Sequence, residues 1–254
     1  MSGGEGLLAG LLPGLVAARE AFGDEAAEPF LFPEEERHVA KAVEKRRREF
    51  TTVRALARDA LARLGGPRVP LLPGERGAPS WPDGFTGSMT HCLGYRGAAV
   101  ARTDALASVG IDAEPDEPLP NEGLLEVISL PEERPALKEL AARWPGVSWE
   151  RLLFSAKESV YKAWFPLTRA WLDFEEAAVT LRPDDDADDD GGSGARTGNG
   201  RGPETGRFTA RLLVPGPVVD GVRLSGFTGR WVARRGLLVT AIAVARAAPA
   251  TTRP

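Results

Sequence analysis

The sequence predicts an α+β fold of two pseudo-symmetric halves, each with a long helix packed on a small antiparallel sheet. Apolar residues recur at helical spacing once in each half, and strand-like runs follow each of these stretches. Each half also ends in a similar run, GYRGAAVAR with VGIDA in the first and GRWVARRGLLVTAIAV in the second. We interpret this likeness as an internal duplication, and the interface between two such halves is a common place for a binding site.

The composition limits the class of protein. The chain of 254 residues carries 32 basic and 36 acidic residues, and its net charge of −4 argues against a uniformly basic nucleic-acid-binding surface. The single cysteine, Cys92, excludes an internal disulfide framework and a cysteine-rich zinc site, and it favours a cytoplasmic protein. The apolar run Leu7–Ala18 is too short for a membrane span and follows no basic residue. We therefore expect a docked N-terminal segment rather than a signal peptide.

The first long helix is expected over residues 33–64. Pro33 and the glutamates after it suit a first turn, where acidic side chains lie at the positive end of the helix dipole. Gly65 and Gly66 end the apolar pattern. The length of the pattern leaves room for a break near Lys45–Glu49.

A loop and a hairpin are expected next. Residues 66–87 are rich in proline and glycine, which is typical of a loop. The runs Ala98–Arg102 and Ser108–Ala113 then predict two strands that form a hairpin, with the turn around Thr103–Asp104.

A proline-rich stretch at residues 114–135 is predicted to link an N-terminal half, residues 1–120, to a C-terminal half, residues 121–254. The second long helix is expected at Ser148–Phe165, because Ser148 is a suitable N-cap and Pro166 is a suitable terminator. Four strands are predicted after it: Ala177–Leu181, Arg207–Val214, Gly229–Arg234 and Leu237–Val244.

Residues 183–206 differ from the rest of the chain because a run of aspartates is followed by glycine, serine and threonine. Such a segment cannot bury enough apolar surface to offset the entropy lost on ordering, so we expect a disordered surface loop between two strands. Clustered aspartates can bind Ca²⁺, but this spacing does not match an EF-hand loop.

Asp112 and Glu114 alternate on a predicted strand and therefore share one face of it. Two adjacent carboxylates repel each other unless a cation or a proton lies between them, and their oxygens suit Mg²⁺. An exposed strand edge with solvated acids is the alternative interpretation of these two residues.

The run FSAKESVYK places Glu158 and Lys162 one turn apart on the second long helix, with Lys157 about 100° round from Glu158. A surface ion pair accounts for this spacing by itself. Beside a metal ion, however, Glu158 would supply a third carboxylate and the lysines would neutralise phosphate.

Basic side chains gather on the first long helix, where residues 41–63 hold eight basic and three acidic side chains. Arg46 and Arg54 could hold a phosphate from one helix face, while a nucleic-acid-binding patch and a solvated face are the alternatives. In the run GSMTH, Ser88 and His91 could donate hydrogen bonds to phosphate oxygens. A lone histidine is also commonly a core residue with satisfied hydrogen bonds.

Together these segments resemble the ordered motifs of Sfp-type 4′-phosphopantetheinyl transferases. The motifs are GSMTHCLGYRGAAVA, VGIDAE and FSAKESVYKAW, in that order. The upstream segments KRRREFTTVRALARDAL and GERGAPSWP are similar to the branch that includes the enterobactin-synthase component. The resemblance covers about residues 37–245 apart from the acidic loop, and it implies two similar α+β halves with coenzyme A in the cleft between them.

The resemblance implies transfer of the 4′-phosphopantetheine arm of coenzyme A to a serine of an apo acyl or peptidyl carrier protein, with release of adenosine 3′,5′-bisphosphate. Such carriers serve fatty-acid, polyketide or nonribosomal-peptide synthesis. The expected metal is Mg²⁺, with Mn²⁺ as a substitute.

The resemblance also implies roles for single residues. Three acids match the metal ligands: Asp112, Glu114 and Glu158. Glu158 is also the candidate that accepts the serine proton, directly or through a metal-bound water. The matched lysines near the pyrophosphate are Lys157 and Lys162, and the matched phosphate-binding positions are Arg46, Arg54, Arg76, Ser88 and His91. The loop that contains Arg76 departs from its relatives, because Pro73 stands where a lysine is often found.

Two other functions stay open at this point. The chain could be a catalytically inactive regulator that binds coenzyme A on the same fold, or a nucleic-acid-binding protein that uses Arg46–Arg58. The presence of all three acids and both lysines favours the enzyme. We further expect a monomer, because two fused halves complete one site.

Overall fold

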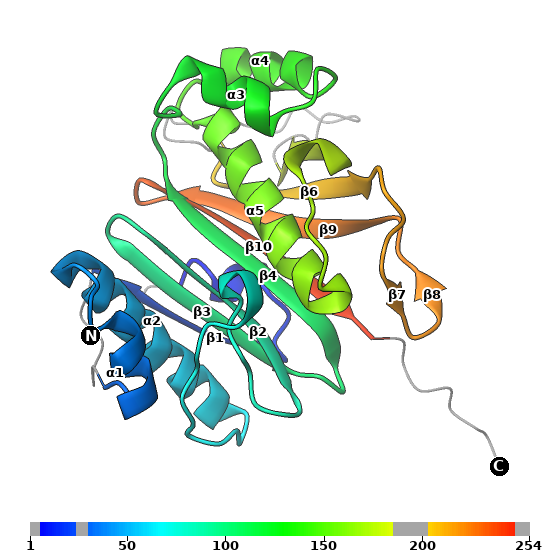
Figure 1. Ribbon diagram of the computed structural model, residues 1–254. Coiled ribbons are helices and arrows are strands. Elements are labelled where there is room, and N and C mark those ends of the chain that lie inside the picture. The colour runs from blue at the N-terminus through cyan, green and yellow to red at the C-terminus, as the bar shows by residue number, and fades with distance from the viewer. Residues whose placement is uncertain (1–5, 24–29, 185–202, 247–254) are drawn as a thin grey trace.

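The computed structural model describes residues 6–23, 30–184 and 203–246. Its elements form two larger antiparallel sheets, each covered by one long helix, and a two-stranded sheet β7-β8 (Figure 1), which confirms the predicted α+β class. The three-stranded sheet has the order β1-β3-β2, and the five-stranded sheet has the order β4-β10-β9-β6-β5. Helix α2 packs on the first sheet and helix α5 on the second.

The helices are α1 Pro33–Val39, α2 Glu44–Arg63, α3 Glu122–Ile128, α4 Arg134–Arg143 and α5 Trp149–Thr168, with short 3₁₀ turns η1 Ala9–Leu11, η2 Glu75–Gly77 and η3 Phe174–Glu176. The strands are β1 Ala17–Phe22, β2 Phe85–Cys92, β3 Tyr95–Arg102, β4 Leu106–Pro115, β5 Ala177–Pro183, β6 Thr205–Leu212, β7 Val218–Val219, β8 Val222–Arg223, β9 Gly226–Arg234 and β10 Leu237–Ala245.

The first predicted helix is in fact two helices. The break between α1 and α2 falls at residues 40–43, just before the stretch where the sequence left room for one. Val43 is extended there (φ −62°, ψ 153°), which turns the chain before α2 begins. The buried face of α2, led by Ala57 and Leu61, packs on the three-stranded sheet.

The predicted hairpin between the strands now numbered β3 and β4 is wrong. β3 pairs with β1 and β2, whereas β4 pairs with β10. β4 nevertheless lies close to β2: the Ser88 hydroxyl accepts a hydrogen bond of 3.1 Å from the main-chain N–H of Ile111. The Thr90 hydroxyl accepts one of the same length from Ala113. β4 thus pairs into the sheet of the C-terminal half, ahead of the boundary expected at residue 120, while its other edge is bonded to the first sheet.

Helix α5 matches the second predicted helix and runs on to Thr168, so the prediction that Pro166 ends it is wrong. The helix ends where Arg169 takes the left-handed conformation (φ 57°). Gly110 of β4 lets α5 approach closely, because a Cβ at that position would clash with the main chain of Ser159 and Ala163. The absence of a side chain at Gly110 therefore sets the spacing between α5 and β4.

The stretch predicted as a linker, residues 114–135, is largely structured. β4 runs to Pro115, α3 follows, and α4 begins at Arg134. Asn121 caps α3 by accepting a hydrogen bond of 2.9 Å from the main-chain N–H of Leu124. With only seven residues, α3 is too short to give a clear periodic signal.

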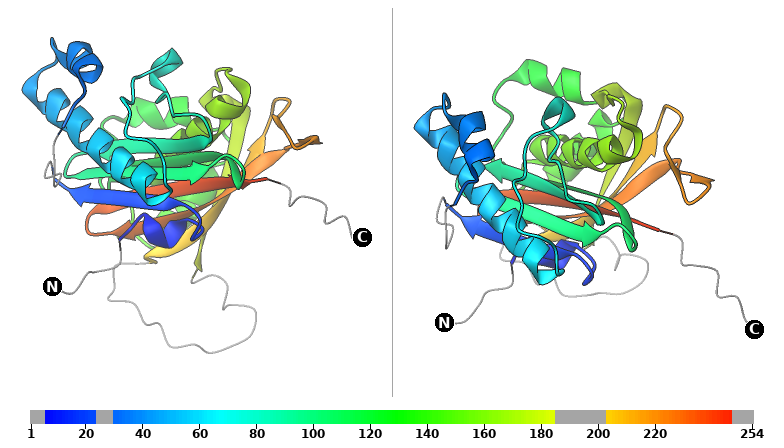
Figure 2. Two further views of the ribbon diagram at one scale, coloured as in Figure 1. Left: turned by 90° about the horizontal axis from the view of Figure 1, so that it is seen from below. Right: turned by 60° about the horizontal axis from the view of Figure 1, so that its bottom comes forward.

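The N-terminal segment docks onto the body, as predicted. Leu7, Leu8 and Leu11 are buried in a core cluster that includes Tyr95 of the first sheet and Val239 of the second. Figure 2 shows this segment on the side of the sheets opposite α5. Strand β1, which the sequence analysis did not predict, continues from it and pairs with β3.

The four strands predicted after α5 are confirmed as β5, β6, β9 and β10, and the last two form a hairpin. The aspartate run of the predicted acidic loop lies almost entirely outside the described residues. Within the described ranges, no helix is long and apolar enough to cross a membrane.

Candidate functional site

Asp112 and Glu114 lie on the face of β4 that α5 covers. In the β4–β10 ladder Asp112 stands opposite Thr240, whose side chain hydrogen-bonds Ser155 of α5. Directly opposite residues of an antiparallel pair share a face, so Asp112 also points toward α5. The alternating neighbours Ile111 and Ala113 are buried on the other face, as the sequence predicts.

The Asp112 carboxylate is 5% exposed and only half satisfied. Its Oδ1 accepts hydrogen bonds from Lys162 Nζ at 2.6 Å and from Thr90 Oγ1 at 3.3 Å. Its Oδ2 is buried and has no hydrogen-bond partner among the described residues. A buried carboxylate oxygen without a partner is costly, which points to a ligand that approaches from that side.

Glu114 and Glu158 lie near Asp112, and each has a neighbouring cation. Burial raises the pKa of Glu114, and the charge of Asp112 raises it further. Arg151 opposes this rise, and its Nη1 donates a hydrogen bond of 2.9 Å to Glu114 Oε2. Burial likewise raises the pKa of Glu158; the Lys162 charge lowers it, and Asp112 raises it. All three predicted acids therefore share one electrostatic neighbourhood.

The acids do not form a ready-made metal cage in the described part of the chain. No group of three histidine, cysteine or acidic side chains there has a metal-binding arrangement. Glu114 is instead held by Arg151, which also donates to the main-chain oxygens of Glu117 and Pro118. The sequence analysis missed Arg151, because only the fold brings it beside β4.

Lys157 stands apart from the other predicted site residues. It is 3% exposed, and its ammonium donates to Glu133 Oε2 and to the Phe174 main-chain oxygen, both at 2.8 Å. The ammonium is thus turned toward the start of α4 and the segment before β5, not toward Asp112. Lys162, five residues further along α5, is the lysine that reaches Asp112.

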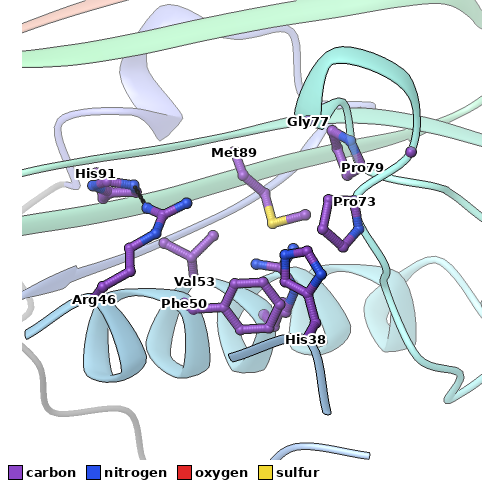
Figure 3. A pocket seen from close by; sticks show the side chains of 11 residues that line it. His38, Arg46, Phe50, Val53, Pro73, Gly77, Pro79, Met89 and His91 are labelled. Carbon is purple, nitrogen blue, oxygen red and sulfur yellow. Dashed lines mark hydrogen bonds between the residues drawn. The ribbon is translucent and has the colours of Figure 1, made fainter. Parts of the chain in front are cut away.

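A cavity of about 400 Å³ lies between α2, β2 and the loop around η2 (Figure 3). Arg46, Phe50 and Arg54 line it from α2, His91 lines it from β2, and the loop contributes Pro73 and Pro79. His38 of α1, stacked on Phe50, was not predicted. None of the described lining residues is acidic, so the cavity suits an anion with an apolar part.

Arg46 and His91 meet at the mouth of this cavity. Arg46 Nη1 lies 2.7 Å from His91 Nε2, which must therefore be the acceptor nitrogen of the ring. Burial lowers the pKa of His91. The negative charge of Glu49 opposes this decrease, whereas the pKa is lowered further by the positive charges of Arg46, Arg96 and Lys162. The histidine is thus neutral at neutral pH and holds the Arg46 guanidinium in place.

Ser88 and Arg76 have other contacts than the sequence suggests. Ser88 is 4% exposed, and its hydroxyl oxygen accepts from the main chain of β4. Arg76, in the left-handed conformation (φ 53°), lies over the ring of Trp171. Burial raises the pKa of Tyr161, and Arg76 lies close enough to oppose that rise. The η2 loop therefore reaches from the first half to the far end of α5.

A second cavity, of about 130 Å³, opens beside Glu158. Tyr161, Trp171 and Phe174 give it an apolar aromatic wall. Trp171, one of the three, is 52% exposed to solvent. The sequence analysis gave these three aromatic residues no role, because no spacing signal marks them as a site.

Two family models of known proteins match this chain. Residues 34–101 match the 4′-phosphopantetheinyl transferase N-terminal domain, and residues 108–188 match the 4′-phosphopantetheinyl transferase superfamily. The chain is 58% identical over 248 residues to the 4′-phosphopantetheinyl transferase Svp of Streptomyces mobaraensis, covering 97% of this chain and 92% of that relative.

Two further relatives match over most of their length. The 4′-phosphopantetheinyl transferase PptT of Mycobacterium tuberculosis is 47% identical over 240 residues, which cover 93% of this chain and 97% of that relative. Npt of Nocardia iowensis is 48% identical over 231 residues, which cover 88% and 96%. Enterobactin synthase component D of Salmonella typhi matches more weakly, at 35% identity over 127 residues, which cover 49% and 51%. The chain therefore belongs to the 4′-phosphopantetheinyl transferase superfamily of enzymes.

Proposed function

We propose that this protein transfers the 4′-phosphopantetheine arm of coenzyme A to a serine of apo acyl or peptidyl carrier proteins. One observation carries the proposal beyond family membership. A cation-lined cavity on the first half and a half-satisfied aspartate on β4 flank one another across β2, which supplies both His91 and Thr90. A dinucleotide-like substrate with a pyrophosphate needs both kinds of site.

The cavity on the first half suits the nucleotide end of coenzyme A. Arg46 and Arg54 line it, and two guanidinium groups can bind phosphate oxygens through paired hydrogen bonds. Phe50 and His38 offer flat rings beside these cations. The cavity therefore provides charge for the adenosine-side phosphates and an apolar surface for the base.

The acids on β4 and α5 suit a divalent cation. Asp112 has a buried oxygen that lacks a donor, and oxygen ligands of this kind favour Mg²⁺. Asp112, Glu114 and Glu158 would hold the ion, and Mn²⁺ could replace it. A bound Mg²⁺ would supply positive charge to the pyrophosphate as the bond to the leaving group breaks.

Lys162 and Glu158 are the residues that would act on the reacting groups. Lys162 would neutralise charge on the pyrophosphate, because its ammonium already lies beside Asp112. Glu158 would accept the serine proton while the serine oxygen attacks the phosphorus that carries the pantetheine, and adenosine 3′,5′-bisphosphate would leave. The raised pKa of Glu158 makes it a better proton acceptor than an exposed glutamate.

The aromatic cavity beside Glu158 suits the pantetheine arm. Its wall of Tyr161, Trp171 and Phe174 is apolar, and it adjoins the proposed base. The proposed path of coenzyme A thus runs from the α2 cavity, past Asp112, to the far side of α5. We further propose a cytoplasmic monomer that acts on fatty-acid, polyketide or nonribosomal-peptide carriers.

The test measures the mass of the acceptor. Purified protein is incubated with coenzyme A, Mg²⁺ and each type of apo carrier, and the carrier is weighed by mass spectrometry. We expect a gain of one phosphopantetheine arm, lost on chelation of Mg²⁺ and reduced about 100-fold or more in Asp112→Asn. The matched control is Asp104→Asn, which changes a 70%-exposed turn aspartate and leaves the rate unchanged.

Two results would contradict the proposal. If no carrier of any of the three types gains mass, the transfer assignment fails. If coenzyme A binds tightly without transfer, the protein is instead the inactive coenzyme A-binding regulator.

A further inference from the structure

The carboxylate of Glu35 is fully buried behind Arg54, which lines the cavity between α2, β2 and the η2 loop (here called the nucleotide cavity), although no sequence motif marks Glu35. It is 0% exposed and lies at the interface of α1, α2 and the chain before the η2 loop. Its Oε1 accepts hydrogen bonds of 2.8 Å from Arg58 Nη1 and from the main-chain N–H of Leu71. Its Oε2 accepts from the main-chain N–H of Phe32 at 2.9 Å and from Arg58 Nη1 at 3.0 Å.

Leu71 is held from two directions by this network. Glu35 takes its N–H, and Arg54 Nε donates to its main-chain oxygen at 2.8 Å. Leu71 itself is fully buried in the core under α2. The next residues form the η2 loop, whose Pro73 and Pro79 line the cavity and pair with each other as an isolated bridge.

Arg54 links the network to the cavity. Its Nε lies 4.0 Å from Glu35 Oε1 and is used on Leu71, while no hydrogen bond joins its terminal nitrogens to a described residue. The guanidinium is therefore held by Leu71 and stacked on the Phe50 ring, while its terminal nitrogens have no hydrogen bond to a described residue. A fork held in this way loses little entropy when it binds a phosphate.

The charges explain why a carboxylate is needed at this place. Burial lowers the pKa of Arg54, and the nearby charges of Arg46 and Arg58 lower it further; Glu35 is the group that opposes this. Without the Glu35 charge, two buried guanidinium groups would face each other with no counter-ion. An uncompensated buried charge relaxes by moving toward water, away from the binding geometry.

We propose that Glu35 is a positioning residue for nucleotide binding: it holds Arg54 and the η2 loop in the geometry that receives the phosphates of coenzyme A. This inference rests on the proposed function, since it assumes coenzyme A as the ligand. Glu35 does not touch the ligand itself, because Arg54 and the loop lie between them. Its effect is therefore on binding and not on the chemical step.

The first test is Glu35→Gln. An amide offers one acceptor oxygen where the carboxylate offers two, and its NH₂ group would face other donors. We expect the Kd of adenosine 3′,5′-bisphosphate, measured by isothermal titration calorimetry, to rise about tenfold or more. The KM for coenzyme A should rise with it, while kcat stays within about threefold of the wild type.

The matched control is Glu20→Gln. Glu20 also accepts two main-chain N–H bonds, from Leu7 and Leu8, and a third from Tyr95, but on the far side of the first sheet. We expect this control to lower the Tm and to leave the Kd of adenosine 3′,5′-bisphosphate unchanged. A rise in Kd equal to that of Glu35→Gln would mean that both act only through general stability, and the inference would be overturned.

A second variant covers the case in which Glu35→Gln does not fold. Glu35→Gln with Arg58→Met removes both partners of the buried pair, which leaves one uncompensated guanidinium instead of two. This double variant should be folded by circular dichroism and still bind adenosine 3′,5′-bisphosphate about tenfold more weakly. Wild-type affinity in a folded variant would overturn the role of Glu35, whereas failure of the wild-type protein itself to bind coenzyme A would overturn the proposed function.

Discussion

The charge balance of the site is set by a few side chains around Asp112. Three carboxylates, those of Asp112, Glu114 and Glu158, share two close cations, Lys162 and Arg151. The residual negative charge is consistent with the unpartnered oxygen of Asp112 and favours an added cation. Burial is the larger cause of the raised pKa values of Glu114 and Glu158, and the charge of Asp112 adds to it in both cases.

The burial of Glu158 predicts that Glu158→Gln raises the stability of the protein and lowers its activity. Because burial raises the pKa of Glu158 above its ordinary 4.5, the folded protein binds this proton more tightly than the unfolded chain does. The Glu158 carboxyl therefore contributes stability that is fully present below pH 4.5. This stability is lost as the pH rises through the pKa that Glu158 has in the folded protein. Without metal, Glu158→Gln should have a higher Tm than the wild type at pH 8, and transfer should fall about 100-fold or more.

The measurement is a thermal melt of both proteins in chelator across the pH range. The difference in Tm should shrink toward zero as the pH approaches 4.5, where the wild-type carboxyl also becomes neutral. A variant that is less stable than the wild type at pH 8 would contradict the electrostatic account of Glu158.

Strand alternation predicts that Asp112 and Glu114 share one face, and helix periodicity predicts that Glu158 and Lys162 do, because both rules are local. That the two pairs meet between β4 and α5 followed only from the family resemblance, and the structure brings them together. Lys157 shares the same motif, yet Glu133, the residue before α4, decides where its ammonium points. The same holds for Glu35, Arg151 and His38, whose partners are distant in sequence.

Among the elements, β4 and α5 form the contact on which the site depends. Asp112 is carried by one and Lys162 by the other, and Gly110 allows their close approach. Ser108 of β4 also donates to the Ala163 main-chain oxygen of α5 at 2.7 Å. A change in the spacing of these two elements would separate the acids from the lysine.

Gly110→Ala tests this contact. The added methyl group would meet the main chain of α5, which cannot move aside as a flexible side chain could. Overpacking of this kind costs about 1–3 kcal/mol of unfolding free energy, measured by denaturant titration, and we expect transfer to fall as Asp112 and Lys162 move apart. The control is Gly10→Ala, where the new methyl has no atom within 4 Å and both quantities should stay unchanged. An active, stable Gly110→Ala protein would show that the spacing is not critical.

The long elements were predicted well in kind and less well in pairing. Helices α2 and α5 and the C-terminal strands follow from periodicity, and the β9–β10 hairpin is local, whereas α3, α4 and β1 were not predicted. The β3–β4 turn looks equally local, yet β4 takes β10 as its partner from more than a hundred residues away. The residues of one strand do not determine which distant strand pairs with it, so the sequence could not predict that β4 pairs with β10 and not with β3.

At the scale of the whole molecule, the N-terminal segment contributes to the core that both sheets share. Leu8 is fully buried there, and the Glu20 carboxylate accepts the main-chain N–H groups of Leu7 and Leu8. The segment lies on the side opposite α5, away from Asp112. It should therefore support the stability of the two-sheet body without contributing to chemistry.

Leu8→Ala tests this division of roles. Removal of a fully buried leucine side chain leaves a cavity and should lower the unfolding free energy by about 2–5 kcal/mol in denaturant titration. The KM for coenzyme A should not change at temperatures where the variant is folded. Leu15→Ala, which truncates a 47%-exposed leucine of the same segment, should change stability by less than about 0.5 kcal/mol. A raised KM in Leu8→Ala would show that the segment also shapes the site.

The double attachment of β4 has a consequence for cutting the chain in two. A break after Pro115 would leave the strand on the first fragment and its backbone partner β10 on the second. Each fragment would then expose a strand edge whose main-chain hydrogen-bonding groups lack their partner. The three acids would also be divided, with Asp112 and Glu114 on the first fragment and Glu158 on the second. Such pieces could regain a complete centre only by reassembling, so this break point turns the enzyme into a complementation pair.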